Sequence, residues 1–322
     1  MYNFAEHLIS RFNKLNFFQF RVVLDKSVEF QDFCLVNKMR YSYVRMNNYT
    51  GYRNVVREQY IHSNKNDMAI VALIRGGKDG YRKFIDRTKL IRDQEWSSKY
   101  DHITIHEGDI TPEEQKQIIR DTGVAMEFID ISYHFEMGKQ RVEKLQAEPP
   151  KNCFFNDWRY GYKCMCDFWF RLFPFVIPAR YKAILRLDDD VILDPDLNDP
   201  TPPDDVMIAS AEYQGLDGAD VTNGMDELSR KFAKEHDLFW PSDGVWSSPL
   251  TNCLYIRMDF ARSKIVQEFQ RVVDESGCIY SNRWGDLPLW GAVMTMLKMP
   301  QHIIKLRYSH LSWEGQMIGS SN

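Results

Sequence analysis

The sequence lacks a long hydrophobic run. None of its apolar stretches reaches the roughly 18 residues that a membrane-spanning helix needs, so no transmembrane helix is expected. The first residues, Met1 to His7, also lack the basic and apolar segments of a secretory signal peptide. We therefore expect a cytoplasmic protein. The alternative is the lumenal domain of a truncated Golgi-type protein.

Paired cysteine motifs and excess positive charge are also missing. The six cysteines include no C-x-x-C spacing, and Cys164 and Cys166 are too close together for an ordinary zinc knuckle. Buried free thiols are the favoured interpretation. The net charge of −4 argues against a nucleic-acid-binding protein, which usually has a basic face. A hydrophobic content of 44%, with 14% aromatic residues, predicts a sizeable core.

Strand and helix patterns alternate from Asp67 onward. Apolar runs predict strands at 68–74, 102–105 and 124–131, and an amphipathic stretch predicts a helix at 81–94. Thr111 is the expected N-cap of a second helix, with proline and glutamate at the positions that complete a capping box. This alternation predicts an α/β fold with a mixed, mostly parallel sheet flanked by helices.

The domain organisation follows from the same patterns. Residues 1–60 show no clean period and are expected to form an extension that packs on the main domain. Residues 61–322 are expected to form that single domain. A proline-rich loop at 194–205 would separate a donor half, about 61–195, from an acceptor half, about 196–322.

Three consecutive carboxylates, Asp188, Asp189 and Asp190, follow a short apolar strand predicted at 183–187. Such a cluster at the end of a buried strand is unfavourable unless positive charge balances it. A divalent cation with oxygen ligands, completed by a phosphorylated ligand, would supply that charge. Ligands also collect beyond the carboxyl ends of strands in parallel sheets. The alternative is an acidic turn in water, because aspartate is a good turn residue.

We assign an expected role to the aspartates of this cluster and to two arginines. The spacing of Asp188 and Asp190 resembles the Asp-x-Asp signature of glycosyltransferases that use nucleotide-sugars, in which the metal bridges the diphosphate. The resemblance implies Asp188 and Asp190 as metal ligands and assigns Asp188 and Asp189 to the nucleotide. The basic groups Arg75 and Arg186 could meet the diphosphate, although each could equally be a surface charge or part of an ion pair.

Three segments then suggest a family. They are Tyr160 to Trp169, with a Tyr-x-x-Met-Cys core; Arg186 to Val191; and Ile279 to Pro288, which contains an Arg-Trp-Gly-Asp-x-Pro string. Together they resemble the fungal α-1,2-mannosyltransferases of glycosyltransferase family 15, in order and approximate spacing from about residue 67 to 313. The last segment is the most specific of the three.

The resemblance implies a GT-A (Rossmann-like) fold and an enzyme that transfers a sugar from a nucleotide-sugar. It implies GDP-mannose as the favoured donor, Mn²⁺ (or Mg²⁺), retention at the anomeric carbon, and an oligosaccharide or glycoprotein glycan as acceptor. His310 matches a metal-ligating histidine of the family, and Tyr162 matches a tyrosine of its site. Asp286 is expected near the acceptor, where a carboxylate can orient or deprotonate a sugar hydroxyl. The alternative for Asp286 is a helix N-cap.

One position departs from the family pattern. The glutamate that is the family's suggested nucleophile falls on Leu254, and leucine cannot attack an anomeric carbon. Another carboxylate, attack from the leaving-group face, or inversion with Asp286 as base would replace it. The departure also leaves two other functions open: a transferase that uses UDP-galactose, UDP-glucose or UDP-xylose, and a non-catalytic carbohydrate-binding protein. A structural Ca²⁺ domain is a third.

Tryptophan is frequent in the second half of the chain. These indoles could stack on the faces of acceptor sugars, but most are expected in the core, because large aromatic side chains dominate burial. They are Trp240, Trp246, Trp284, Trp290 and Trp313.

Overall fold

A six-stranded sheet forms the centre of the fold in a computed structural model, which describes residues 66–77, 81–148, 160–195, 197–215, 218–311 and 317–319. The strand order is β3-β2-β1-β4-β9-β6. The first four of these strands are parallel, whereas β9 pairs antiparallel with β4 and with β6. Their bounds are β1 Met68–Ile74, β2 Tyr100–His106, β3 Met126–Asp130, β4 Ala183–Leu187, β6 Ile208–Ser210 and β9 Cys253–Arg257. The expected extension, 1–60, lies outside the described residues.

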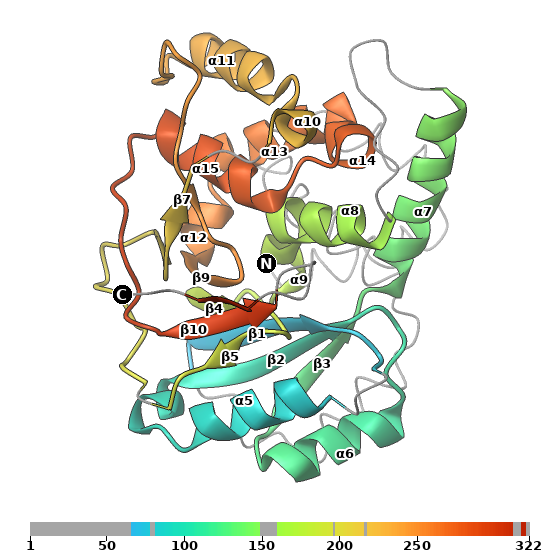
Figure 1. The fold of residues 1–322 in the computed structure, drawn as a ribbon, viewed down its shortest axis with the longest axis vertical. Coiled ribbons are helices and arrows are strands. Elements are labelled where there is room, and N and C mark those ends of the chain that lie inside the picture. The colour runs from blue at the N-terminus through green and yellow to red at the C-terminus, as the bar shows by residue number, and fades with distance from the viewer. Residues whose placement is uncertain are drawn as a thin grey trace, which may run out of the picture. The chain divides into compact units, whose positions relative to one another are not determined.

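Helices cover both faces of this sheet (Figure 1). Helices α5 (Arg82–Arg92) and α6 (Pro112–Thr122) lie on one face, while α8 (Tyr160–Asp167) and α15 (Asp286–Met296) lie on the other. The remaining elements are η1 Glu95–Lys99, α7 Ser132–Ala147, η2 Phe168–Leu172, α9 Phe173–Val176, β5 Ile192–Leu193, β7 Tyr213–Gln214, α10 Ala219–Thr222, α11 Met225–Glu235, β8 Ser248–Pro249, α12 Met258–Ala261, α13 Lys264–Ser276, α14 Cys278–Asn282, β10 Tyr308–Leu311 and β11 Met317–Gly319.

The local sequence signals explain the first half of this fold. The apolar run of β1 is buried at six of its seven positions, as expected for a central parallel strand. At the start of α6, Thr111 accepts a bond from the Glu114 backbone and Glu114 bonds back to Thr111, so the predicted capping box is present. The predicted α/β class with a mixed, mostly parallel sheet is confirmed.

The strand order has a topological switch point between β1 and β4. Strand β1 has β2 on one side and β4 on the other, so the chain moves outward from β1 to β3 and then returns to β4. Ligands in open α/β sheets bind outside the carboxyl ends of the strands at such a switch point. The predicted cluster Asp188–Asp190 follows the carboxyl end of β4, and Arg75 follows that of β1.

A second, three-stranded sheet lies next to the Asp188–Asp190 cluster. Strand β10 pairs antiparallel with β5, with Tyr308 opposite Leu193 and Ser309 opposite Ile192, and also with β11. Because β5 closely follows Asp188–Asp190, the pairing of β5 with β10 holds the backbone just beyond the carboxylates. Within the described residues, no helix has the length and apolar character needed to cross a membrane.

Candidate active site

The three carboxylates occupy a turn whose backbone is held on both sides. The Asp188 amide donates to the Asn252 carbonyl at 3.0 Å, next to β9, and the Val191 amide donates to the Asp188 carbonyl at 3.1 Å. Asp189 and Asp190 therefore lie in a short turn between β4 and β5. The turn follows the carboxyl end of β4, as the sequence predicts, and β4 pairs with β1.

Arg186 links two of the predicted site carboxylates. It is only 2% exposed although it is charged. Its Nε and Nη2 donate to the two carboxylate oxygens of Asp188 at 2.7 and 3.0 Å, and its Nη1 donates to Asp286 at 2.5 Å. The guanidinium lies 4.3 Å from the ring centroid of Trp169. Burial opposes the charged form of Arg186, but Asp188 and Asp286 outweigh it and raise its pKa.

Asp286 is the first residue of α15, and it is 3% exposed. The N-cap position belongs to Gly285, and no side chain caps this end of the helix. The alternative role as an N-cap therefore does not describe Asp286. Its carboxylate instead neutralises Arg186, so the two predicted site residues form one buried ion pair across residues that are far apart in the sequence.

Tyr162 lies beside Asp286. Its pKa is raised, first by Cys166, then by burial and by Asp286. The Arg283 guanidinium lies 4.9 Å from the ring centroid of Tyr162. Arg283 has a φ of 64°, a left-handed conformation that costs about 1–3 kcal/mol for such a residue and occurs often at functional sites. The structure thus brings the Arg-Trp-Gly-Asp segment and the α8 segment together at the same place.

Negative charge is concentrated in the turn. The pKa of Asp189 is raised to about 6, by burial first and then by the charges of Asp190 and Asp188. Asp189 still presents an exposed surface to solvent, whereas Asp188 and Asp190 are half-buried. Repulsion among the carboxylates is thus the second contribution to this shift, after burial, and a divalent cation would relieve that repulsion.

The ends of β1 and β2 contribute a second group of polar residues. Arg75 Nε donates to Glu107 at 2.9 Å, and the arginine side chain is 59% exposed. The Gly76 amide donates to the Asp109 carboxylate at 2.6 Å. A Cβ at Gly76 would come within 2.4 Å of the Asp109 carbonyl oxygen, so only glycine fits here. Arg75 is exposed but paired with Glu107, so its contact with a diphosphate stays a prediction, and Gly76 holds the loop close to Asp109.

His310 and Leu254 are defined by strand register. His310 lies in β10 and pairs with Ile318, one position beyond the Ser309 and Ile192 pair, so its backbone is level with the end of the Asp turn. Its role as a metal ligand stays a prediction. Leu254 lies in β9 opposite Arg186 and is 2% exposed. A buried leucine at this position supplies no nucleophile.

The carboxylates suit a divalent cation that a phosphorylated ligand helps to bind. Within the described part of the chain, no three histidine, cysteine or acidic side chains form a complete metal cage. Mg²⁺ at nucleotide sites is typically held by one or two carboxylates together with substrate phosphates, so a complete cage is not required. Asp188 and Asp190 provide such oxygen donors, and the raised pKa of Asp189 indicates the excess negative charge that a cation would balance.

Sequence reasoning missed two groups at this site. Arg87, on α5, donates an Nη1 hydrogen bond to the Asp188 carbonyl. Asn252 accepts the Asp188 amide through its backbone and the Tyr308 hydroxyl through its side chain, at 2.7 Å. The signal for Arg87 was a charged residue on the buried side of an amphipathic helix. Asn252 had no distinguishing local signal.

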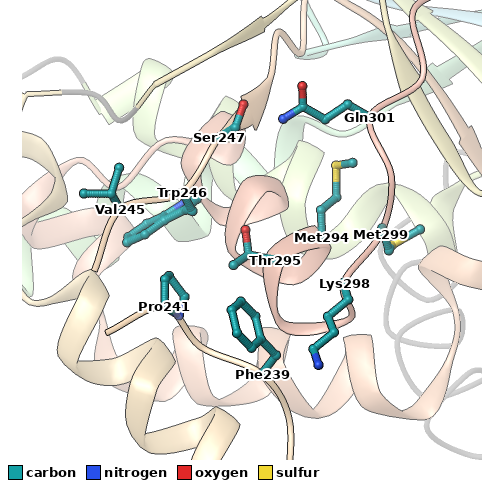
Figure 2. Close-up of a pocket in the computed structure, with 10 residues that line it drawn as sticks. All are labelled: Phe239, Pro241, Val245, Trp246, Ser247, Met294, Thr295, Lys298, Met299 and Gln301. Carbon is teal, nitrogen blue, oxygen red and sulfur yellow. The ribbon is translucent and has the colours of Figure 1, made fainter. Parts of the chain in front are cut away.

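A separate pocket of about 400 Å³ lies at the opposite end of α15 from Asp286 (Figure 2). Phe239, Trp246 and Lys298 are among the side chains that line it. Phe239 is 45% exposed, and the Lys298 ammonium lies 5.0 Å from its ring centroid. Trp246 is buried, and its indole nitrogen donates to the Pro288 carbonyl at 3.0 Å.

The other tryptophans mostly serve the core, as expected. Trp284 and Trp290 are almost fully buried, Trp240 is half-buried, and Trp313 lies outside the described residues. Among the described cysteines, Cys164, Cys166 and Cys253 are buried free thiols, as expected, and Cys278 is also buried; Cys34 and Cys153 lie outside the described residues.

Comparison with known proteins identifies the fold. No family model matches the chain, and no curated protein matches it by sequence. The structure is similar to core-mannan synthase A (CmsA/Ktr4) from Aspergillus fumigatus in its Mn/GDP form, with a TM-score of 0.60 and 16% identity over 78% of this chain and 76% of that chain. It is also similar to the mannosyltransferase Ktr4p from S. cerevisiae in complex with GDP, with a TM-score of 0.58 and 17% identity over 77% and 72% of the two chains.

The chain has a GT-A glycosyltransferase fold. The Asp turn, the Arg186 and Asp286 ion pair and Tyr162 all lie at the carboxyl-end edge of this GT-A sheet, the edge at which α/β sheets bind their ligands. The resemblance drawn from the three sequence segments is confirmed at the level of the fold.

Proposed function

We propose that the protein is a metal-dependent glycosyltransferase that moves a sugar, with mannose favoured, from a nucleotide-sugar to a hydroxyl of an oligosaccharide or glycoprotein glycan. The observation that carries the proposal is the Asp188–Asp190 turn at the β1 and β4 switch point of a GT-A sheet. The favoured donor is GDP-mannose, because the similar structures are mannosyltransferases crystallised with GDP. A UDP-sugar is the alternative donor.

Each residue on the donor side of the site has a proposed role. Asp188 and Asp190, with His310, would hold Mn²⁺ or Mg²⁺, and the bound cation would neutralise the diphosphate leaving group. Arg75 would meet the phosphates from the β1 side, because its exposed guanidinium lies at the end of the neighbouring strand. Asp189 would contact the nucleotide. Arg186 orients Asp188 through its two hydrogen bonds.

Asp286 and Tyr162 would act on the acceptor side. With leucine at position 254, Asp286 is one of two carboxylates that bind Arg186, and the other, Asp188, is assigned to the metal. We assign to Asp286 the orientation or deprotonation of the acceptor hydroxyl, with inversion as the outcome if it acts as the base. Its burial and its bond to Arg186 mean that an acceptor must displace neighbouring groups to reach it.

A non-catalytic carbohydrate-binding protein is the second candidate. Leu254 favours it, and so does the pocket at the far end of α15, because an exposed phenylalanine beside polar groups suits the apolar face and hydroxyls of a sugar. This candidate predicts glycan binding that requires neither a nucleotide nor a metal.

Hydrolysis and binding of a donor panel separate the candidates. The panel contains GDP-mannose, GDP-fucose, UDP-hexoses and UDP-xylose, each with Mn²⁺ and with EDTA. Turnover of one donor that requires metal, is lost in Asp190→Ala and is retained in the exposed control Asp205→Ala would support the transferase. Absence of binding to every donor in the presence of Mn²⁺ would overturn it.

A further inference from the structure

Arg87 is a charged residue on the buried side of an amphipathic helix. It is 3% exposed, and the other residues on this side of α5 are Phe84, Ile85, Thr88 and Ile91. An apolar side chain is expected at such a position, because the buried stripe of an amphipathic helix packs on the core. Burying a guanidinium carries a desolvation penalty of several kcal/mol. A charged residue at this position therefore indicates an interaction that offsets the desolvation penalty.

The contacts of Arg87 point to the Asp turn. Its Nη1 donates to the Asp188 carbonyl. Among the residues that the structure describes, no carboxylate oxygen lies within 4.0 Å of Arg87, and its Nε has no hydrogen-bond partner. Burial lowers its pKa to about 10, while Asp189, Asp188 and Asp190 act in the opposite direction. Arg87 thus remains charged at neutral pH and lies in the field of all three carboxylates.

Two arginines hold Asp188 by different groups. Arg186 binds its carboxylate, whereas Arg87 binds its backbone carbonyl. The same carbonyl accepts the amide of Val191, so it is the point at which the turn closes. The bond from Arg87 therefore acts on the backbone that carries Asp189 and Asp190. Helix α5 also contacts β5, the strand that leaves the turn.

We propose that Arg87 is a positioning residue of the cation and diphosphate site: by binding the Asp188 carbonyl it fixes the turn that aims the carboxylates. This inference rests on the proposed function for the identity of the ligand. A through-space charge effect predicts the opposite sign for the cation, because a buried positive charge repels Mn²⁺. Removing Arg87 would tighten Mn²⁺ binding if only its charge mattered, and would weaken it if the bond to the turn matters.

The first test uses Mn²⁺ alone, and Mn²⁺ with GDP, on the intact chain. Arg87→Met removes the hydrogen bond and the charge but fills the space, so the fold is expected to survive. We expect Mn²⁺ to bind about tenfold more weakly, as loss of a hydrogen bond from a charged group implies. Arg87→Lys, which keeps the charge and a donor, should recover part of this loss. Arg82→Met, on the exposed side of α5, is the matched control and should bind as wild type does. Unchanged or tighter Mn²⁺ binding in folded Arg87→Met would overturn the proposal.

The second test needs no ligand. Amide exchange at 188–191 should be about tenfold faster or more in Arg87→Met than in wild type, because the loss of the same hydrogen bond loosens the turn. Exchange in β1 should not change. Unaltered exchange at 188–191 in a folded variant would also overturn the role of Arg87. Failure of wild type to bind Mn²⁺ with any nucleotide would instead overturn the proposed function, and the exchange measurement would still decide the role of Arg87.

Discussion

Loss of the Asp286 carboxylate should destabilise the protein strongly. Asp286→Ala leaves the Nη1 of Arg186 without its acceptor in a site where Arg186 is 2% exposed. Removing one partner of a buried ion pair costs about 3–5 kcal/mol. Because Asp188 still binds Arg186 through two bonds, we expect the lower end, about 3 kcal/mol. For a chain of 322 residues, that corresponds to a fall in Tm of roughly 4–5 °C.

Thermal unfolding of the ligand-free protein measures this effect. The control is Glu275→Ala, which breaks the exposed Arg271 and Glu275 pair of α13. That change should alter stability by less than about 0.5 kcal/mol, because surface pairs contribute little. An Asp286→Ala variant as stable as the control would show that the pair with Arg186 contributes no net stability.

A double-mutant cycle tests whether the two residues act on each other. Arg186→Met leaves the Asp286 carboxylate buried and uncompensated, and adding Asp286→Leu removes that charge. The double variant should therefore be more stable than the sum of the single changes predicts, by about 1 kcal/mol or more. Additivity within about 0.5 kcal/mol would refute a direct coupling across the site.

Three further predictions concern other parts of the chain. The folded-state pKa of Asp189, about 6, lies above its unfolded value, so Asp189 destabilises the fold as pH rises from about 4 to 6. Asp189→Asn should therefore raise Tm at pH 8 and leave it unchanged at pH 4. An equal gain in Tm at both pH values would contradict this. Gly76→Ala should weaken GDP binding by at least tenfold and lower the free energy of unfolding by about 1–3 kcal/mol, because the added Cβ would displace Asp109. Wild-type affinity for GDP would show that the loop adjusts to the added Cβ. Thr111→Ala should cost about 1 kcal/mol in denaturant unfolding through loss of the α6 capping box, with no change in donor binding.

The sequence predicted the first half of the fold because local signals dominate there. Continuous apolar runs marked β1 and β4, and the capping residues marked the start of α6, each from neighbouring positions. The Asp turn followed from the same reasoning, since three carboxylates after a buried strand are chemically unusual. These inferences depend on residues that are close in the chain, and they match the structure.

The connections within the site were not predictable in this way. The bond between Arg186 and Asp286 joins residues that are 100 positions apart, and no local pattern encodes it. Arg87 was hidden because a basic residue in a polar helix is ordinarily a surface charge. The expectation that Asp286 caps a helix failed as an alternative because Gly285 occupies that position. Long-range charge pairing, rather than local pattern, thus determines which polar residues form the site.

The pairing of β5 with β10 has a consequence for folding during synthesis. Strands β1, β2 and β3 follow one another in the chain and can pair as soon as they emerge. Strand β5, which leaves the Asp turn, must wait for β10, which follows β6, β9 and α15 in the chain. The carboxylates therefore acquire their final backbone support only after all six strands of the central sheet have been synthesised, and a nascent protein can hold a native sheet while its ligand site is still incomplete.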